Sequence, residues 1–355
     1  MVDRSGRLFR RMKEIDYRAL RLLVEKSIGG SRLKRDFELR RYDKAWKEGR
    51  LGYPDDETPE NQWRLCEARF MLGDYSSWMG WEYRSPWSAG VWHNQARWHQ
   101  FGDLYYNQGG TWFGHRCENL YVYGEQGIGD EVCFSQALLQ AKDLVDEVIL
   151  ETDPRMMSVF ERSLGVKCVP AVYEERGGEK IRVFRDVEHP WITLGELVRN
   201  FRRKKADFPR EPYLVADPEL VKKFAGFNGR VGISWRGAQG SYPLEQFKKL
   251  AENPVGLQYD LAWDEEVEVP GFDLRDDLES LLGLLSNLER VITVSTSVAH
   301  FAAALGVKTD LILAPLNGVR KNMLQFKWWC EPGGETPWYP PTVRVFRNLD
   351  EYRRA

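Results

Sequence analysis

Short apolar runs alternate with segments of helical spacing over much of the chain, and the clearest unit lies near residue 300. Val291–Val294 is apolar and β-branched, as expected of a strand buried on both faces. Ser295–Ser297 follows, with residue types that begin helices, and apolar positions recur at helical spacing over Val298–Leu305. Gly306 is a typical helix stop, and Asp310–Ala314 is a second apolar run. The pattern predicts a strand, a tight turn, a helix and a strand.

The same alternation extends over two stretches of the chain that are separated by a proline-containing connector at Asp186–Tyr213. Strands are predicted at Leu120–Tyr123, Glu147–Glu151, Val166–Val169, Val231–Trp235 and Gly256–Tyr259. Helices are predicted at Glu131–Val145, Pro154–Leu164, Pro243–Ala251 and Leu278–Leu288. Two such series predict an α/β protein with two doubly wound sheets that face a cleft.

The N-terminal third has a different pattern. Its apolar residues recur at helical spacing, and seven of the 14 tryptophans lie between Trp63 and Trp112. Packing within an irregular helical module explains this density, and sugar-stacking platforms are the alternative. We therefore expect three regions: a helical, Trp-rich region at 1–115, a Rossmann-like domain at 116–210 and a second Rossmann-like domain at 211–355.

Composition narrows the class of protein. With 355 residues, 43% hydrophobic residues and a net charge of −2, the chain can bury a sizeable core. It has no run of ~20 apolar residues and no signal-peptide core, so we expect a cytoplasmic protein. Residues 1–50 carry 16 Lys/Arg against 8 Asp/Glu. This basic region is either a solvated helical face or a contact for an anionic partner.

Cysteine and histidine spacing gives no indication of a metal site. The five cysteines form no CxxC pair, and the five histidines form neither HxxxH nor HExxH. Asp276-Asp277 is adjacent rather than spaced as DxD, and it opens a predicted helix, which favours a capping role. We therefore expect neither a disulfide framework nor a dedicated metal centre.

Two predicted loops carry the candidate chemistry. The turn at Ser295–Ser297 leaves N–H groups at the positive end of a helix, which can hold a diphosphate without a lysine. The first strand leads into Tyr123–Asp130, whose glycines do not match GxGxxG, so a dinucleotide fingerprint is excluded. Asp130 begins the next helix, where it either caps that helix or accepts a proton from an attacking hydroxyl.

Four motifs in this order, EQGIGDEVCFSQALL, VGISWRG, GLQYD and VITVSTSVAHFAAALG, resemble the glycosyltransferase module found behind tetratricopeptide repeats. That module is similar to the lipopolysaccharide heptosyltransferase family (glycosyltransferase family 9-like). MLGDYSSWMGWEYR resembles the last repeat and linker, and PWYP at 337–340 resembles the C-terminal segment, so the resemblance covers roughly residues 65–345. It implies the GT-B fold, two Rossmann-like domains facing a cleft, here with a helical, degenerate repeat-like N-terminal extension.

The resemblance also implies roles for residues. Asp130 resembles the general base, and Ser295, Thr296, Ser297 and His300 resemble the segment that meets the donor diphosphate. Many relatives have Asp where this chain has Ser295, so the donor sugar or the activity can differ. The remaining expected positions are phosphate contacts at Trp235 and Arg236, nucleoside contacts at Gln258 and Tyr259, and an acceptor-side loop at Glu125, Gln126, Gly127 and Gly129.

The sequence thus predicts a transferase that moves a sugar from a nucleotide-diphosphate sugar to a hydroxyl acceptor, with inversion and without a metal or other cofactor. The acceptor is a glycan, a protein or a nucleic-acid base. Two other hypotheses stay open: a non-catalytic binding or scaffold protein of the same fold, which Ser295 favours, and a glycosyltransferase of a modified nucleic-acid base, which only the basic N-terminal region favours.

Overall fold

The computed structural model describes residues 112–355, apart from 113, 125–126, 177–178, 184, 186, 203, 209, 239, 262–266 and 315–333. The predictions for residues 1–111, including the helical Trp-rich region and the basic segment, lie outside the described residues, as do Glu125 and Gln126. None of the helices in the described part is both long and apolar enough to cross a membrane.

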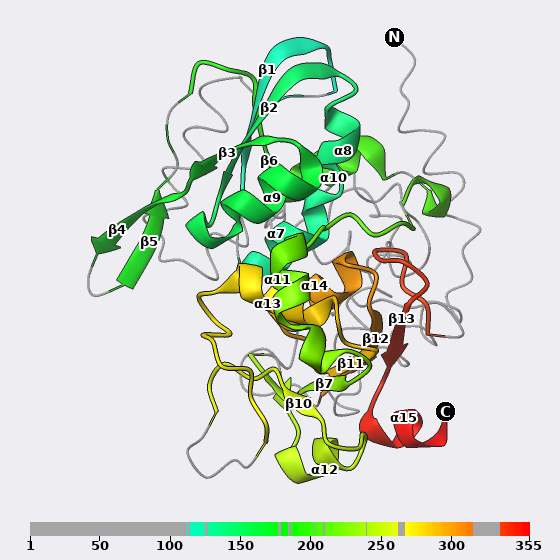
Figure 1. Ribbon diagram of the computed structural model, residues 1–355. Coiled ribbons are helices and arrows are strands. Elements are labelled where there is room, and N and C mark those ends of the chain that lie inside the picture. The colour runs from blue at the N-terminus through cyan, green and yellow to red at the C-terminus, as the bar shows by residue number, and fades with distance from the viewer. Residues whose placement is uncertain are drawn as a thin grey trace, which may run out of the picture.

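The described chain forms two lobes, each built on a parallel sheet (Figure 1). In the first lobe the strand order is β3-β2-β1-β6, and every neighbouring pair is parallel. The strands are β1 (Cys117–Tyr123), β2 (Val145–Thr152), β3 (Lys167–Pro170) and β6 (Trp191–Thr193). The helical segments of this lobe are α7 (Ile128–Ser135), α8 (Leu138–Ala141), η2 (Pro154–Met156), α9 (Met157–Leu164) and α10 (Leu194–Phe201).

The second lobe has the strand order β10-β7-β11-β12-β13, again parallel throughout. Its strands are β7 (Val231–Ser234), β10 (Val255–Gly256), β11 (Arg290–Thr293), β12 (Lys308–Ile312) and β13 (Val343–Phe346). Its helices are α12 (Leu244–Lys248), α13 (Leu278–Leu285), α14 (Ser297–Ala304) and α15 (Leu349–Arg354). The segments η3 (Lys205–Asp207), α11 (Pro218–Lys223) and η4 (Ala225–Phe227) precede this sheet, and the short pair β8 (Arg236–Gly237) and β9 (Gly240–Ser241) follows β7.

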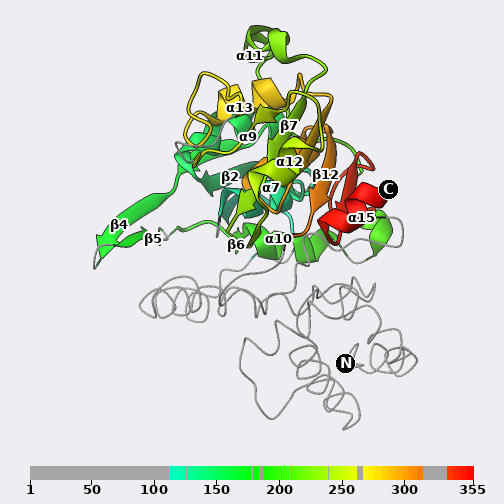
Figure 2. The ribbon, with the colours of Figure 1, turned by 90° about the horizontal axis from the view of Figure 1, so that it is seen from below.

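An antiparallel hairpin that the sequence analysis did not predict projects from the first lobe. Its strands are β4 (Val172–Arg176) and β5 (Glu179–Val183), and Figure 2 shows the hairpin extending away from the rest of the molecule. The predicted connector at Asp186–Tyr213 was wrong in part, because it contains β6 and α10. β6 is three residues long and fully buried, so it lacks both the length and the alternation that mark a strand in a sequence.

The predicted helix over Glu131–Val145 is also divided. The Ser135 and Gln136 side chains donate to backbone carbonyls of the preceding turn, Val132 O and Cys133 O, which competes with regular helix continuation. The chain then forms the short α8 and enters β2 at Val145. The other predicted strands and helices of residues 120–314 are present within a few residues, and the α/β class with two parallel, Rossmann-like sheets is confirmed.

The lobes meet through their helices, and one apolar core runs through both. α7 of the first lobe packs against α14 of the second, and the buried cluster includes Phe134 of α7 and Phe301 of α14. The segment before β13 returns to the first lobe, where Trp338 packs edge-on against both Phe134 and Phe208. Gln136 donates to the Trp338 carbonyl at 3.1 Å.

Ion pairs join the lobes at the edge of this core. Arg162 of α9 donates to both carboxylate oxygens of Glu279 in α13, at 2.9 and 2.6 Å. Arg155 of η2 donates to the Arg275 carbonyl at 2.9 Å and to Asp276 Oδ1 at 3.1 Å. Asp277 caps α13 by accepting from the Ser280 amide at 3.0 Å, which confirms the predicted capping role at this position. These ion pairs are partly exposed, so each contributes less to the stability of the protein than the buried core contacts do.

Because one core is shared, both lobes should unfold together. Phe301→Ala should lower the free energy of unfolding by about 3–5 kcal/mol, the usual cost of truncating a buried phenylalanine. Glu279→Gln removes a half-exposed ion pair and should cost about 1 kcal/mol or less. Urea denaturation followed by tryptophan fluorescence and far-UV circular dichroism measures both, and two separate transitions in the parent protein would contradict the shared core.

Candidate functional site

The strand order of the second sheet predicts where a ligand would bind. The strand order reverses at β7, because β10 lies on one side of β7 in the sheet and β11 lies on the other. In such sheets, ligands bind outside the carboxyl ends of the strands at the point where the order reverses. The loops that follow β7 and β11 carry Arg236 and Ser295–Ser297. A Cβ on Gly237 would lie 2.6 Å from the Ser295 carbonyl oxygen, so these two loops are in contact.

The loop after β11 ends in the amino terminus of α14. Thr296 is the N-cap residue in extended conformation, and within the described residues no side chain caps this helix. The Thr296 hydroxyl lies instead 3.3 Å from the Thr293 hydroxyl. The first-turn N–H groups and the helix dipole therefore give this edge of the sheet a positive end that suits an anion. Gly306 has a φ of 78°, which confirms the predicted left-handed stop after the helix.

The Gln258 side chain holds the loop after β7 through hydrogen bonds. Its Oε1 accepts from Ser234 Oγ at 3.2 Å and from the Arg236 amide at 3.1 Å, and its Nε2 donates to Asp260. The Arg236 guanidinium donates to the Asp260 carbonyl and lies over the Trp235 ring. Gln258 is 3% exposed, so its amide is committed to this scaffold.

Two other residues that were predicted to contact the nucleotide sugar differ in exposure. Trp235 is 1% exposed, and its indole lies in the second lobe's core with Phe247 and Ile292, so the structure does not bring its side chain to the site. Tyr259 is 57% exposed, with the Arg275 guanidinium 5.9 Å from its ring centroid, so its ring is accessible to a planar group.

The first sheet has its own reversal point, between β1 and β6, and Asp130 lies next to it. The order β3-β2-β1 runs one way and β6 lies on the other side of β1, so the loop after β1 follows the same rule as the loop after β7. Gly127 is the N-cap of α7, and among the described residues no side chain caps this helix. Asp130 lies in the first turn of α7 and is half-buried, a position distinct from the capping role that was its alternative.

Gly129 and His300 bring the two reversal points together. A Cβ on Gly129 would lie 2.7 Å from His300 Cδ2 and 3.3 Å from His300 Nε2, so only glycine allows this approach. His300 is 5% exposed, and its Nδ1 lies 2.5 Å from the Tyr339 hydroxyl. The loop that carries Asp130 thus lies against the helix whose amino terminus follows Ser295 and Thr296.

A buried ionic cluster beneath this loop was missed by the sequence analysis. Arg182 of β5 donates to Glu131 Oε1 at 2.8 Å and to the Glu151 carbonyl at 2.9 Å, and its Nε is 3.6 Å from Glu151 Oε1. Thr152 donates its hydroxyl to Glu131, and Tyr121 donates to Glu151 at 3.0 Å. Arg182 lies in a short hairpin strand, and nothing local in the sequence marks its guanidinium as buried.

Burial dominates the electrostatics of this cluster. It raises the pKa of the Glu131 carboxyl above its usual value, and the Arg182 guanidinium opposes that rise. The pKa of Glu151 is raised for the same reason, again with Arg182 as the main opposing charge. A Cβ on Gly124 would lie 2.4 Å from Glu131 Oε1, so the chain after β1 passes directly over this carboxylate. The cluster therefore fixes the start of α7, one residue from Asp130.

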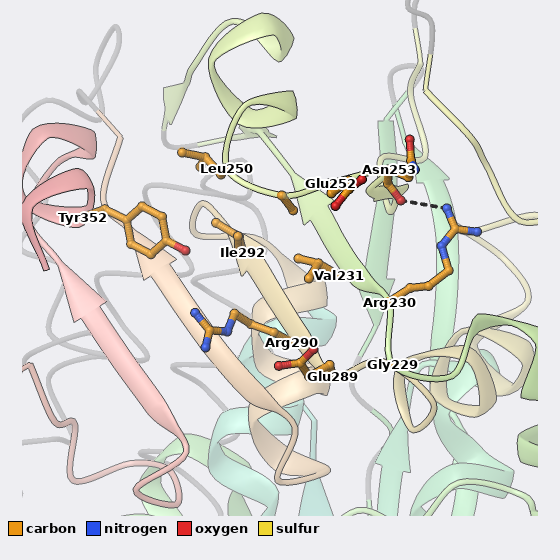
Figure 3. Close-up of a pocket in the computed structure, with 11 residues that line it drawn as sticks. Gly229, Arg230, Val231, Leu250, Glu252, Asn253, Glu289, Arg290, Ile292 and Tyr352 are labelled. Carbon is orange, nitrogen blue, oxygen red and sulfur yellow. Dashed lines mark hydrogen bonds between the residues drawn. The ribbon is translucent and has the colours of Figure 1, made fainter.

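A separate pocket of about 510 Å³ lies at the opposite edge of the second sheet (Figure 3). It is lined by the amino ends of β7 and β11, by the turn after α12 and by Tyr352 of α15. Arg230 donates there to the Asn253 carbonyl at 2.8 Å and pairs with Glu268, and Arg290 pairs with Asp310. None of the site residues that were predicted from the sequence lines this pocket.

Comparisons with known proteins give weak similarities. No protein family model matches the chain. Protein FlbA of Caulobacter vibrioides (strain ATCC 19089 / CIP 103742 / CB 15) is 26% identical over 288 residues, which are 67% of this chain and 45% of FlbA. The chain thus spans less than half the length of this curated relative.

The solved structures that are similar to the chain include two glycosyltransferases. The glycosyl transferase family 9 protein from Veillonella parvula DSM 2008 is 11% identical, with a TM-score of 0.48, over 67% of this chain and 88% of that one. The E. coli ADP-heptose lps heptosyltransferase II is 13% identical, with a TM-score of 0.41, over 64% and 90%. Both are members of the family that the sequence motifs resemble.

Removing Arg182 should destabilise the protein in a pH-dependent way. In Arg182→Leu the Glu131 carboxyl loses its main opposing charge, so its folded-state pKa rises further. Stability is then lost as the pH rises through that pKa, because a buried, unpaired carboxyl must ionise. We expect a small deficit at pH 5 that grows toward about 3–5 kcal/mol at pH 8.

Urea denaturation across this pH range measures the deficit. Arg185→Leu is the matched control, because Arg185 is 41% exposed and lies 3.8 Å from Glu151 Oε2, so its loss should cost about 1 kcal/mol or less. A deficit in Arg182→Leu that shrinks with rising pH would contradict the assigned pairing.

Gly129→Ala should separate α7 from α14. The new Cβ would overlap the buried His300 ring, and overpacking of this kind typically costs about 1–3 kcal/mol. Gly226→Ala is the control, because nothing lies within 4 Å of the Cβ it would add. Thermal denaturation compares the two variants, and equal stability would show that Gly129 tolerates a side chain.

Proposed function

We propose that the protein is a glycosyltransferase that moves a sugar from a nucleotide-diphosphate sugar to a hydroxyl acceptor. One observation carries the proposal: the contact between Gly129 and His300 joins the reversal points of two parallel sheets. One reversal point offers the uncapped amino terminus of α14, and the other offers the carboxylate of Asp130. The ordered set of sequence motifs that resembles the heptosyltransferase family supports the same activity.

The donor diphosphate would rest against the amide groups that begin α14. The Thr296 and Ser297 amides and the helix dipole would stabilise it, and Arg236 would add a positive charge from the adjoining loop. Tyr259, whose ring is accessible, is proposed to face the nucleoside, whereas Gln258 would act by supporting the Arg236 amide rather than by touching the donor. These protein groups would balance the negative charge of the diphosphate, so the proposed reaction uses no metal ion.

The proposed reaction is a direct displacement with inversion. The acceptor oxygen forms a bond to the anomeric carbon while the bond from that carbon to the diphosphate oxygen breaks. The nucleoside diphosphate leaves with the bonding electron pair, and the acceptor hydroxyl transfers its proton to the Asp130 carboxylate. Cytoplasmic nucleotide sugars would supply the donor.

Ser295 supports a second candidate, a binding or scaffold protein that retains the fold. Many relatives have an Asp at this position, whereas here Ser295 is half-buried and its carbonyl lies against Gly237. A scaffold would not bind nucleoside diphosphates. Calorimetric titration with ADP, GDP and UDP therefore separates the two candidates.

Asp130→Asn should abolish sugar transfer and leave nucleoside diphosphate binding nearly intact. Losing a general base typically costs 10²–10⁴-fold in rate, whereas the donor contacts lie on the other lobe. Transfer is measured by release of nucleoside diphosphate from candidate sugar donors, and binding is measured by calorimetry.

Asp143→Asn is the matched control, because Asp143 is an exposed carboxylate after α8 and away from the loop after β1. It should retain full turnover. Full turnover of Asp130→Asn would remove Asp130 from the role of base.

A further inference from the structure

A gap between two helices creates the pocket at the amino edge of the second sheet. Phe247 of α12 and Leu349 of α15 belong to the buried cluster on the face of the sheet that carries Ile292. Between the turn after α12 and Tyr352 of α15 this face stays open, and the pocket of about 510 Å³ lies there (Figure 3). Its volume is within the range of about 300–1,000 Å³ that is typical of sites for small molecules.

The floor of this pocket is apolar, and one of its walls is aromatic. Val231 pairs with Arg290 in the register of β7 and β11, so Val231 and Ile292 point to the same face of the sheet. The Tyr352 ring is held in place by its hydroxyl, which donates to Asp310 at 3.3 Å. Apolar side chains from the turn after α12 also line the pocket, namely Leu250 and Ala251. Such a surface favours a ligand with methylene groups.

Arg230 fixes the backbone on two sides of the pocket. Its guanidinium donates to the Asn253 carbonyl at 2.8 Å, next to Glu252. Its backbone carbonyl accepts from the Glu289 amide at 2.9 Å. The guanidinium also donates to both carboxylate oxygens of Glu268, at 2.9 and 2.7 Å, and these hydrogen bonds raise the pKa of Arg230. The positive charge of Arg230 is therefore balanced within the protein.

Arg290, the other arginine of the pocket, is also paired. Its Nη1 donates to Asp310 at 3.1 Å, and Asp310 is 3% exposed and also accepts from Arg344 at 3.0 Å. Burial disfavours the charge of Arg290, but Asp310, with smaller contributions from Tyr352 and Glu289, raises its pKa overall. Both arginines of the pocket thus donate to carboxylates of the protein itself.

The carboxylates of Glu252 and Glu289 differ from these groups, because within the described residues neither takes part in a hydrogen bond or an ion pair. Both residues are exposed, and Figure 3 shows them on opposite sides of the floor formed by Val231 and Ile292. The described part of the chain has no group of three or more His, Cys, Asp or Glu residues that could hold a metal ion. The pocket therefore favours an organic cation, because an anion would meet two negative charges.

We propose that this pocket binds a linear diamine, with one ammonium group at Glu252, the other at Glu289 and the methylene chain over Val231 and Ile292. Each ammonium group donates a charge-assisted hydrogen bond to a carboxylate, and the chain loses contact with water on the apolar floor. The Tyr352 ring adds a cation–π attraction at the side wall. The inference does not rest on the proposed function, because the pocket lies at the opposite edge of the sheet from the proposed donor site.

Calorimetric titration of the full chain with 1,4-diaminobutane tests the proposal. At neutral pH and low salt we expect saturable one-to-one binding with a dissociation constant below about 1 mM. 1-Aminobutane has the same methylene chain but a single ammonium group, so it should bind about fivefold more weakly. Butane-1,4-diol carries no charge and should not bind.

Two substitutions locate the site. Glu252→Gln and Glu289→Gln each remove the charge of an exposed side chain, so the fold should be unaffected. Each should weaken the binding of 1,4-diaminobutane about fivefold and remove its advantage over 1-aminobutane. Glu245→Gln is the matched control, because Glu245 is an exposed carboxylate of α12 that pairs with Lys248 and does not line the pocket. It should bind the diamine as the parent does.

Several results would overturn the inference. One is the absence of saturable diamine binding up to about 10 mM. Another is equal affinity of the parent protein for 1,4-diaminobutane and 1-aminobutane. Equal losses in all three variants would show that the diamine is attracted by net charge alone. Saturable binding of succinate in place of the diamine would show that the paired arginines, and not the two carboxylates, determine the ligand.

Discussion

The close approach of Gly129 to His300 is the constraint on which the arrangement of the two lobes depends. Each parallel sheet places a helix amino terminus at the edge where its strand order reverses. Helices α7 and α14 can lie side by side only because one of them has no side chain at the point of contact. The same contact fixes two different chemical groups relative to each other, a carboxylate on one lobe and a set of amide groups on the other.

The two sides of this contact are held in different ways. On the first lobe, an ionic cluster with Arg182 at its centre fixes the start of α7, and its components come from β1, β2, β5 and α7 itself. On the second lobe, the Tyr339 hydroxyl contacts His300, and Gln258 supports the neighbouring loop. The start of α7 is thus held by charged groups, whereas the loop after β7 is held by the Gln258 amide together with Arg236 and Asp260.

Much of this arrangement could be predicted from the sequence, because the parallel strands are buried on both faces and appear as apolar runs. Val231–Ser234 and Arg290–Thr293 are examples, and the turn at Ser295–Ser297 was predicted with its helix and its glycine stop. The two reversal points were not predictable, because strand order depends on pairing between segments more than fifty residues apart. The brief strand β6 was missed for the same reason, since it is defined by its pairing with β1.

Side-chain orientation set a second limit on prediction. Trp235 and Gln258 belong to loops that the sequence correctly placed near the site, but tertiary packing turns both side chains inward. Arg182 lies outside the sequence motifs, and its hydrogen-bond partners come from α7 and β2. Tyr339 lies in the PWYP segment, and its hydroxyl contacts His300 of α14. A single sequence records such residues as ordinary aromatic or basic positions. The PWYP segment was noticed only through its resemblance, without any role for its tyrosine.

The return of Trp338 into the first lobe has a consequence for how the molecule can move. Hinge-type domain closure requires two bodies whose cores are separate, whereas here an indole from the far end of the chain completes the packing around Phe134 and Phe208. Swinging the lobes apart would pull that indole out of its socket and expose aromatic surface to water. Any such opening would therefore cost buried aromatic packing in addition to the ion pairs between α9 and α13.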